Sequence, residues 1–380
     1  MEIYLDNAAT TKVDKRVVES MIPYYNEKYG NPSSSHLKGE EAKRAIQESR
    51  EVIAKQIGAK YKEIIFTGSG TESNNLAIKG LFFKNYPEKN HIITTKIEHD
   101  CVLNTCKWLE TQGAKVTYLD VDEKGFVNIK DIEEAITNKT FLVSVIHGNN
   151  EIGVIQNIRE IGALCKEKKV LFHTDACQSF TKVSINVEKD NIDLMTLNAH
   201  KIHGPKGVGA LYIKKGIEIY PLLHGGNQEF GLRSSTENVA GIIGFGKAIK
   251  ISSWRDVKEM TKLRDYFIHE ILKIPNTKLN GARGEERLCN NINISFNNIE
   301  GESIGSYLNA SKIYTSTGSA CSSHSLEPSH VLLAIGLSPL QANSSVRMSI
   351  SKYTTKEEIA YVLKEIKRVV EKLRRISPLK

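Results

Sequence analysis

Two apolar runs in the middle of the chain end in side chains of opposite charge, Asp175 and Lys201. The run at residues 170–172 leads into Asp175, and the run at residues 194–197 leads into Lys201. Both side chains therefore fall where a predicted strand meets its following loop, which is the edge at which open α/β sheets bind ligands. A partly desolvated lysine at such an edge can lose its proton and attack a carbonyl group.

A carboxylate beside that lysine suits one cofactor in particular. The charge of Asp175 would keep the nitrogen of a pyridinium ring protonated and electron-withdrawing, and Lys201 would form a Schiff base with the ring's aldehyde. Taken alone, a lysine or an aspartate at a strand end is more often a solvated or capping residue. The two together indicate pyridoxal 5'-phosphate.

Residues 64–75 could bind the phosphate of such a cofactor. An apolar run is followed by a turn with Gly68 and Gly70 and then by a helix start rich in Ser and Thr. Free N–H groups at a helix N-terminus hold phosphate, and glycines allow its close approach. No Gly-Lys-Ser/Thr is present and the third glycine of a dinucleotide fingerprint is missing, so a monophosphate fits best. A capped helix without a ligand would look similar.

Three further polar residues lie just past predicted strands. His99 begins a helix, where its imidazole could stack on a planar ring and exchange protons near neutral pH. Asn150 and Gln178 could each hold a ring hydroxyl. Because all of these positions are strand ends of one sheet, a single pocket can collect them.

Six cysteines are scattered through the chain without a CxxC pair: Cys101, Cys106, Cys165, Cys177, Cys289 and Cys321. This distribution fits a reducing compartment and argues against a disulfide framework. A metal site at His99, Cys101 and Cys106 is disfavoured because no other ligands complete four positions, so no metal is expected.

Residues 315–328 form a small, polar segment that carries Cys321. Most free cysteines are buried and inert, but an exposed thiol on a mobile loop can enter a pocket and leave it again. Further along, Arg347 could bind a substrate carboxylate through two parallel hydrogen bonds. A lone arginine on a strand is more often a surface or salt-bridge residue.

Strand-like runs alternate with helical segments or loops, at residues 64–67, 91–95, 116–121, 141–146, 170–173, 193–197 and 208–213. Strands divided by helices indicate βαβ units, and therefore an α/β fold with a mainly parallel seven-stranded sheet covered on both faces. An amphipathic helix that ends at Gly58 precedes the first run. We predict a large domain at residues 15–249.

Beyond Trp254 the pattern changes to a smaller α+β domain, predicted at residues 1–14 and 250–380. A long charged helix comes first, followed by a strand at 289–296, a helix at 304–308 and a final helix at 355–375. The final helix has one apolar face and basic residues on the rest. A solvated basic face is favoured there over a docking site.

The composition limits the class of protein. The chain has 380 residues, 40% of them hydrophobic, and a formal net charge of +8, so it can bury a sizeable core. No apolar run approaches the length of a membrane span and the first residues do not resemble a signal peptide, so a soluble, cytoplasmic protein is expected. Basic blocks interleaved with aromatics are missing, so direct binding of nucleic acid is not expected.

The order of these motifs resembles the pyridoxal-phosphate cysteine desulfurases of the NifS/IscS type, over essentially the whole chain. The resemblance is carried by residues 5–11, 30–34, 70–75, 98–99, 149–153, 175–178, 200–201, 204–207, 233–238 and 318–321. It implies the aminotransferase class V fold, a fold-type I homodimer with its active site at the subunit interface.

Residue by residue, the resemblance implies that Lys201 holds the cofactor, Asp175 pairs with the ring nitrogen and His99 stacks on the ring. Gln178 and Asn150 would flank the ring oxygen. The phosphate would be bound by Gly70, Thr71 and His200, joined by Thr236 of the partner subunit. Asn198 stands where the family usually has a phosphate-binding serine, so an amide would replace a hydroxyl.

The resemblance also implies the reaction. Asn150 and Arg347 would orient the carboxylate of L-cysteine, and Cys321 would attack the substrate sulfur. The products would be alanine and a persulfide on Cys321, which passes sulfur to an acceptor such as an iron-sulfur scaffold protein. The alternatives are a selenocysteine lyase or other class V lyase, and a catalytically weak sulfur-relay scaffold whose cofactor is structural.

Overall fold

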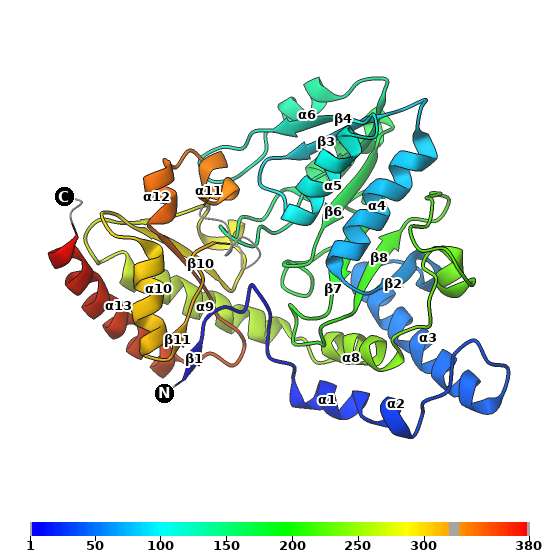
Figure 1. The fold of residues 1–380 in the computed structure, drawn as a ribbon, viewed down its shortest axis with the longest axis horizontal. Helices are drawn as coiled ribbons and strands as arrows, with labels where there is room; N and C mark the ends of the chain where they lie inside the picture. The colour runs from blue at the N-terminus through cyan, green and yellow to red at the C-terminus, as the bar shows by residue number, and fades with distance from the viewer. Residues whose placement is uncertain (1, 319–326, 378–380) are drawn as a thin grey trace.

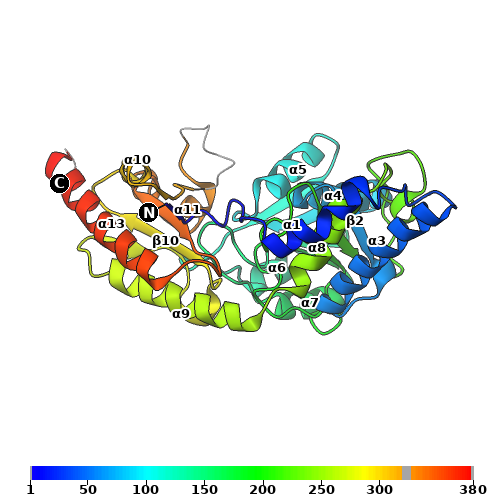
Figure 2. The ribbon, with the colours of Figure 1, turned by 90° about the horizontal axis from the view of Figure 1, so that it is seen from below.

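The chain folds into two lobes, which lie side by side in Figure 1. The structure is a computed structural model that describes residues 2–318 and 327–377. The larger lobe contains a seven-stranded sheet, and the smaller one contains the first and the last described residues. Helix α9 (Trp254–Ile271) runs along the smaller lobe towards the larger one (Figure 2).

The strands of the large sheet lie in the order β2-β8-β7-β6-β5-β3-β4. Their bounds are Ile64–Thr67 (β2), His91–Thr95 (β3), Lys115–Leu119 (β4), Thr140–Ser144 (β5), Leu171–Asp175 (β6), Leu194–Asn198 (β7) and Gly209–Ile213 (β8). Strands β3 to β7 pair in parallel, whereas β8 is antiparallel to β7 and β2. The predicted α/β class and mainly parallel seven-stranded sheet are confirmed.

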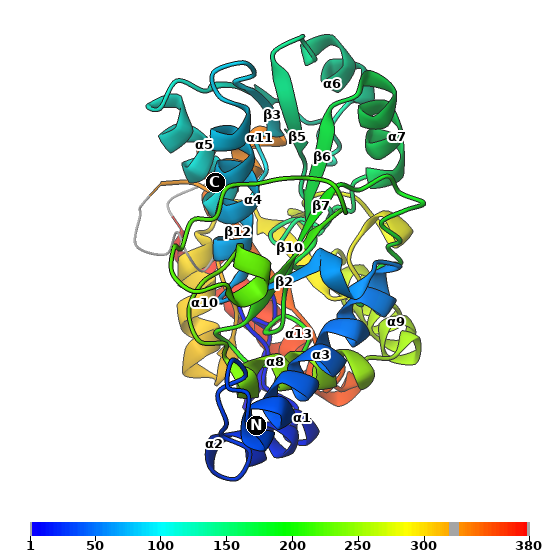
Figure 3. The same cartoon turned by 90° about the vertical axis from the view of Figure 1, so that its right-hand side faces the viewer.

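Helices cover both faces of this sheet, because alternate strand residues point to opposite sides. Ile65 faces a core made with α4 (Gly70–Asn85) and α5 (Asp100–Glu110). Phe66 faces the opposite core, made with α1 (Lys15–Met21), α3 (Leu37–Ile57), α6 (Ile129–Ala135), α7 (Ile158–Lys168) and α8 (Val239–Lys250). Figure 3 shows α4 and α5 on one side of the strands, and α3 and α7 on the other.

Helix boundaries follow local sequence signals. Helix α3 ends at Gly58, as predicted; this glycine has φ 73°, and its N–H donates to the carbonyl of Ala54. Helix α4 begins after Ser69, whose hydroxyl accepts the N–H of Glu72. The remaining helical turns of this lobe are α2 (Pro23–Asn26), η1 (Tyr61–Glu63) and η2 (Gln228–Gly231).

The smaller lobe is built on an antiparallel sheet with the order β12-β10-β9. These strands are Thr277–Leu279 (β9), Asn291–Phe296 (β10) and Ser345–Ser349 (β12), and β1 (Ile3–Tyr4) pairs in parallel with β11 (Ile313–Tyr314). The helical elements besides α9 are η3 (Gly284–Glu286), α10 (Gly301–Ala310), α11 (His330–Ala334), α12 (Pro339–Asn343) and α13 (Lys356–Ile376).

The first residues of the chain belong to the core of the smaller lobe. Ile3 and Leu5 are fully buried in one apolar cluster with Phe267, Ile294 and Val370. This shared core supports the division into residues 15–249 and residues 1–14 with 250–380, which stays a prediction. None of the described helices is long and apolar enough to cross a bilayer.

Candidate active site

One cavity lies at the carboxyl ends of the central strands, where the sheet meets the first residues of the chain. Its wall contains ten of the predicted site residues: Gly70, Thr71, His99, Asn150, Asp175, Gln178, Asn198, His200, Lys201 and Arg347. The segments that supply them are far apart in sequence; Arg347 comes from β12 of the smaller lobe, and the others follow strands of the large sheet or begin a helix. The sequence-based expectation that one pocket collects them agrees with this geometry.

Asp175 is the last residue of β6 and its carboxylate is held at both oxygens. Oδ1 accepts the N–H of Cys177 at 2.9 Å, and Oδ2 accepts Nδ2 of Asn74 at 2.7 Å. The side chain is 5% exposed and borders the cavity. A carboxylate fixed in this way can face a pyridinium nitrogen without reorganising.

His99 is the N-cap of α5, as predicted. Its Nδ1 accepts the backbone N–H of Cys101 at 3.1 Å, and the Sγ of Cys101 lies 3.1 Å from the same nitrogen. The carboxyl of the preceding residue, Glu98, is fully buried, and burial raises its pKa to about 8.

Lys201 follows β7, and its amine donates to two carbonyls from the start of the chain. These are the carbonyls of Ala8 and, at 2.7 Å, Ala9. Gln178 donates from Nε2 to the Ala8 carbonyl at 2.8 Å. The small side chains at positions 8 and 9 let this backbone come close to the lysine.

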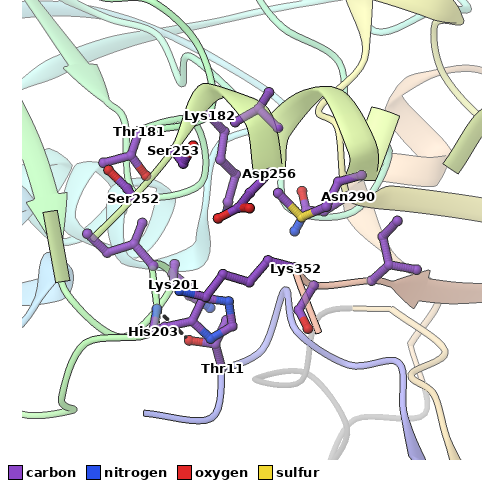
Figure 4. A pocket seen from close by; sticks show the side chains of 15 residues that line it. Thr11, Thr181, Lys182, Lys201, His203, Ser252, Ser253, Asp256, Asn290 and Lys352 are labelled. Atoms are coloured by element: carbon purple, nitrogen blue, oxygen red, sulfur yellow. Dashed lines mark hydrogen bonds between the residues drawn. The ribbon is translucent and has the colours of Figure 1, made fainter. Parts of the chain in front are cut away.

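A second cavity borders Lys201 on the side of α9 (Figure 4). Lys182 lies in its wall and donates to the carbonyl of Gln178 at 3.0 Å; burial lowers the pKa of Lys182. Lys352 is paired with Asp14 at 3.0 Å. Asp256 lies in the same wall, so this cavity is lined by side chains of both charge signs.

The other end of the main cavity lies against the N-terminus of α4. A Cβ at Gly70 would stand 2.7 Å from the Sγ of Cys177, so a larger residue would have to displace that buried sulfur. Asn198 is 4% exposed and its Oδ1 has no hydrogen-bond partner among the described residues. Burial lowers the pKa of His200 to about 3, so its imidazole is neutral at pH 7.

These features fit the phosphate of pyridoxal phosphate. Helix N–H groups and a neutral imidazole can donate to an anion, and so can Nδ2 of Asn198, which lies 3.4 Å from where a Cβ at Gly70 would stand. The carboxylate of Asp175 lies in the wall of the same cavity, where it suits the ring nitrogen. The residues present therefore fit both charged parts of this cofactor.

Arg347 lies on β12 and is almost fully buried. Its Nη2 donates to Oδ1 of Asp6 at 2.9 Å and its Nη1 to the carbonyl of Asn150 at 3.3 Å, while its Nε has no partner among the described residues. The pairing with Asp6 was not predicted from the sequence. Arg347 still borders the cavity, with a donor left for a substrate carboxylate.

Two predicted site residues are not in the cavity wall. Thr236 is exposed on its own chain, a position that leaves it available to a partner subunit. Cys321 lies outside the described residues. Of the described residues on either side of it, Ser316 forms a backbone bridge with Arg347 of the cavity wall, and Ser329 donates to Oε2 of Glu151, the residue after Asn150, at 2.6 Å.

Three residues of the cavity wall had no site role predicted from the sequence, Asn74, Cys101 and Cys177, whereas Ser69 lies in the segment predicted to bind phosphate. Asn74 lies one helical turn after Gly70 and therefore on the same side of α4, a spacing that could have indicated it. Cys101 follows His99 by two residues. No group of three or more metal-ligating side chains forms among residues 2–318 and 327–377.

The chain belongs to the aminotransferase class-V family, whose model matches residues 3–362. Within this family its relatives are cysteine desulfurases: "Cysteine desulfurase IscS" of Dictyoglomus turgidum is 52% identical over 383 residues, covering 100% of this chain and 97% of the relative. The resemblance predicted from the sequence is thereby confirmed. Enzymes of this family depend on pyridoxal phosphate.

Solved structures agree with this assignment. A "NIFS-LIKE PROTEIN" superposes with a TM-score of 0.92 at 40% identity, over 98% of this chain and 100% of its own. A structure described as "SspA in complex with cysteine" gives a TM-score of 0.84 at 41% identity, over 93% of this chain and 100% of its own. The fold-type I architecture predicted from the sequence is confirmed by these neighbours.

Proposed function

We propose that the chain is a cysteine desulfurase that binds pyridoxal 5'-phosphate and removes sulfur from L-cysteine. The observation that carries the proposal is that Lys201, Asp175 and His99 border one cavity in a chain whose relatives are named for this activity. A lysine, a fixed carboxylate and an imidazole around one cavity match the needs of a pyridoxal ring.

In this proposal each end of the cofactor has its own protein groups. Asp175 would bind the ring nitrogen, Gln178 and Asn150 the ring oxygen, and His99 the ring face. The phosphate would lie against Gly70, Thr71, Asn198 and His200. Thr236 of the partner subunit would join them. Lys201 would hold the aldehyde carbon.

When bound, pyridoxal phosphate supplies an electron-withdrawing ring that stabilises negative charge on the substrate carbon. The amine of Lys201, released from the carbonyls of Ala8 and Ala9, would take the Cα proton of L-cysteine and return a proton later. Arg347 and Asn150 would fix the substrate carboxylate, which orients the Cα–H bond towards that amine.

Cys321 would act as the nucleophile. Its thiolate would attack the sulfur of the bound cysteine, so that an S–S bond forms while the C–S bond breaks. The carbon fragment takes up a proton and leaves as alanine, and Cys321 keeps a persulfide. This role rests on the resemblance, because Cys321 lies outside the described residues.

The partners follow from the same proposal. A homodimer would bring Thr236 of the partner subunit to the phosphate, and an acceptor protein such as an iron-sulfur scaffold would take the sulfur. A cytoplasmic location suits the free thiols of the chain.

Mass spectrometry after incubation with L-cysteine tests the proposal. Wild-type protein should be yellow, should release alanine, and should gain one sulfur atom on the peptide that contains Cys321. Lys201→Ala should be colourless and release no alanine, whereas the matched control Lys262→Ala, on the surface of α9, should behave as wild type. No alanine from cysteine would falsify the proposal.

Cys321→Ala separates this mechanism from a selenocysteine lyase or another class V lyase. The variant should bind the cofactor with an unchanged absorption band and release no alanine from cysteine. Unchanged alanine release by Cys321→Ala would show that the persulfide mechanism is wrong.

A further inference from the structure

Asp175 and His99 are joined by a chain of hydrogen bonds through two residues, Asn74 and Cys101. From this geometry we propose that Cys101 is a positioning residue, whose thiol holds the imidazole of His99 neutral, with its proton on Nε2. The inference rests on the proposed function only where it concerns turnover.

The orientation of Asn74 fixes the first link. Its side chain is fully buried, and its Nδ2 donates to Oδ2 of Asp175 at 2.7 Å and to Sγ of Cys101 at 3.1 Å. Turning the amide round would place its carbonyl oxygen against the carboxylate of Asp175, so the nitrogen must face both partners. The sulfur of Cys101 is therefore an acceptor towards Asn74.

The backbone fixes the second link. The N–H of Cys101 lies 3.1 Å from Nδ1 of His99, and a backbone N–H can only donate. Nδ1 is therefore an acceptor and carries no proton. The Sγ of Cys101 lies 3.1 Å from the same nitrogen, so its S–H is the group that can donate there.

The donor and acceptor roles are consistent along the whole series of hydrogen bonds from Asp175 to His99. Asp175 accepts from Asn74, Asn74 donates to the sulfur of Cys101, and the thiol donates to His99. With two donors on Nδ1, protonation of that nitrogen would break both contacts. The network therefore opposes a cationic imidazole beside the ring site and fixes the plane of the ring.

Other charged groups around His99 act on it from several elements. Glu98 precedes it, and burial raises the pKa of that carboxyl to about 8. From α11, Nε2 of His330 donates to the carbonyl of Glu98 at 3.0 Å, and Nδ1 of His330 lies 3.9 Å from Asp100. The carboxylate of Asp175 borders the same cavity.

The basic groups of that cavity are Lys201, His200 and Arg347. None of these charged groups is removed when Cys101 is replaced. A change in the titration of His99 that occurs only in Cys101 variants therefore reports the loss of the thiol.

The titration of His99 tests the proposal directly. Full-length protein with ring-¹⁵N histidine, with and without pyridoxal phosphate, should show His99 as the Nε2–H form in wild type. In Cys101→Ala the titration midpoint of His99 should rise by about half to one pH unit, since one hydrogen bond to the neutral ring is lost. Cys101→Ser, whose hydroxyl can make the same two contacts, should stay close to wild type.

Cys106→Ala is the matched control, because it removes a thiol from the same helix without a contact to His99. It should leave the midpoint unchanged. A wild-type ring protonated on Nδ1, or a midpoint that is the same in Cys101→Ala and wild type, would overturn the proposal.

Turnover gives an independent arm. If alanine is released from cysteine, the acid limb of the kcat profile should move to higher pH in Cys101→Ala by the same interval, with little change of KM, and Cys101→Ser should restore it. A chain that released no alanine would contradict the proposed function but would leave the histidine titration decisive for Cys101.

Discussion

Glu98 shows at the level of one residue how burial changes chemistry in this molecule. Its Oε1 accepts the hydroxyl of Thr95 at 2.7 Å and the N–H of Ile146 at 2.8 Å, while Oε2 has no partner among the described residues. Burial raises the pKa of this carboxyl to about 8, and repulsion from Asp175 adds to the shift. At neutral pH the folded protein therefore holds a proton on Glu98.

Replacing Glu98 with glutamine should change how stability depends on pH. The unfolded chain loses the Glu98 proton near its ordinary pKa of 4.5 and the folded chain near 8. Ionisation therefore favours the unfolded state increasingly across this interval, and wild type loses stability that Glu98→Gln keeps. The difference in unfolding free energy should grow in favour of the variant by roughly 2–4 kcal/mol between pH 5 and pH 8.

Urea unfolding at pH 5, 6, 7 and 8 measures this difference. Glu134→Gln, an exposed glutamate on α6, is the control and should show the same pH dependence as wild type. A constant difference between Glu98→Gln and wild type across this range would mean that Glu98 is ionised in the folded protein.

The residues of the site were predictable from the sequence where they directly follow a predicted strand. Asp175 and Lys201 stand directly after apolar runs, so their place at one sheet edge follows from the alternation of strands and helices. Asn74 and Cys101 were not predictable in this way, because their roles depend on contacts between α4, α5 and β6. The pairing of Arg347 with Asp6 spans 341 positions and has no local signal.

At the scale of elements, one buried ion pair fixes the segment that leads to Thr236. Arg50 on α3 donates through both Nη atoms to Glu229 of η2, each at 2.7 Å, and Glu229 also accepts the N–H of Phe66 on β2 at 2.7 Å. Both charged side chains are at most 6% exposed. Glu229 and Phe230 have φ of 48° and 59°, a left-handed conformation that these contacts hold in place.

Glu229→Gln should be costly because it leaves the Arg50 charge buried without its counter-charge. We expect a loss of about 2–4 kcal/mol in the free energy of unfolding. Residues 233–236 follow η2 directly, so the apparent affinity for pyridoxal phosphate should also fall. Denaturant unfolding and cofactor titration by absorbance measure the two effects.

The matched control is Glu259→Gln, which removes one carboxylate from the exposed pair with Lys262 on α9. This pair should be worth no more than about 0.5 kcal/mol. Equal losses in the two variants would show that the Arg50 pair contributes no more than a surface pair does.

The strands buried along their whole length were predictable and the shortest elements were not, for a physical reason. Strands such as β2, β5 and β7 are buried along their whole length, so they appear as continuous apolar runs. Strands β1, β9 and β11 have only two or three residues each, too few to show a run of their own. Their place depends on partners distant in the chain: β1 pairs with β11.

At the scale of the whole molecule, the proposed homodimer would complete a site that one chain leaves open. Thr236 is exposed and does not border the cavity of its own chain. The resemblance assigns it to the phosphate of the other subunit, which requires two chains for each complete site. Sedimentation should give twice the mass of one chain.

A heterodimer of two impaired variants shows whether each active site uses Thr236 of its own chain or of the partner subunit. Lys201→Ala and Thr236→Val, each weakly active or inactive alone, are co-expressed with different tags and purified as the mixed dimer. If the partner subunit's Thr236 completes the site, the Thr236→Val chain keeps its own lysine and receives an intact threonine from the other chain. One of the two sites is then complete, and alanine release should recover to about half of wild type. If Thr236 served its own chain, each site would lack one group, and the mixed dimer would be no more active than the average of its parents.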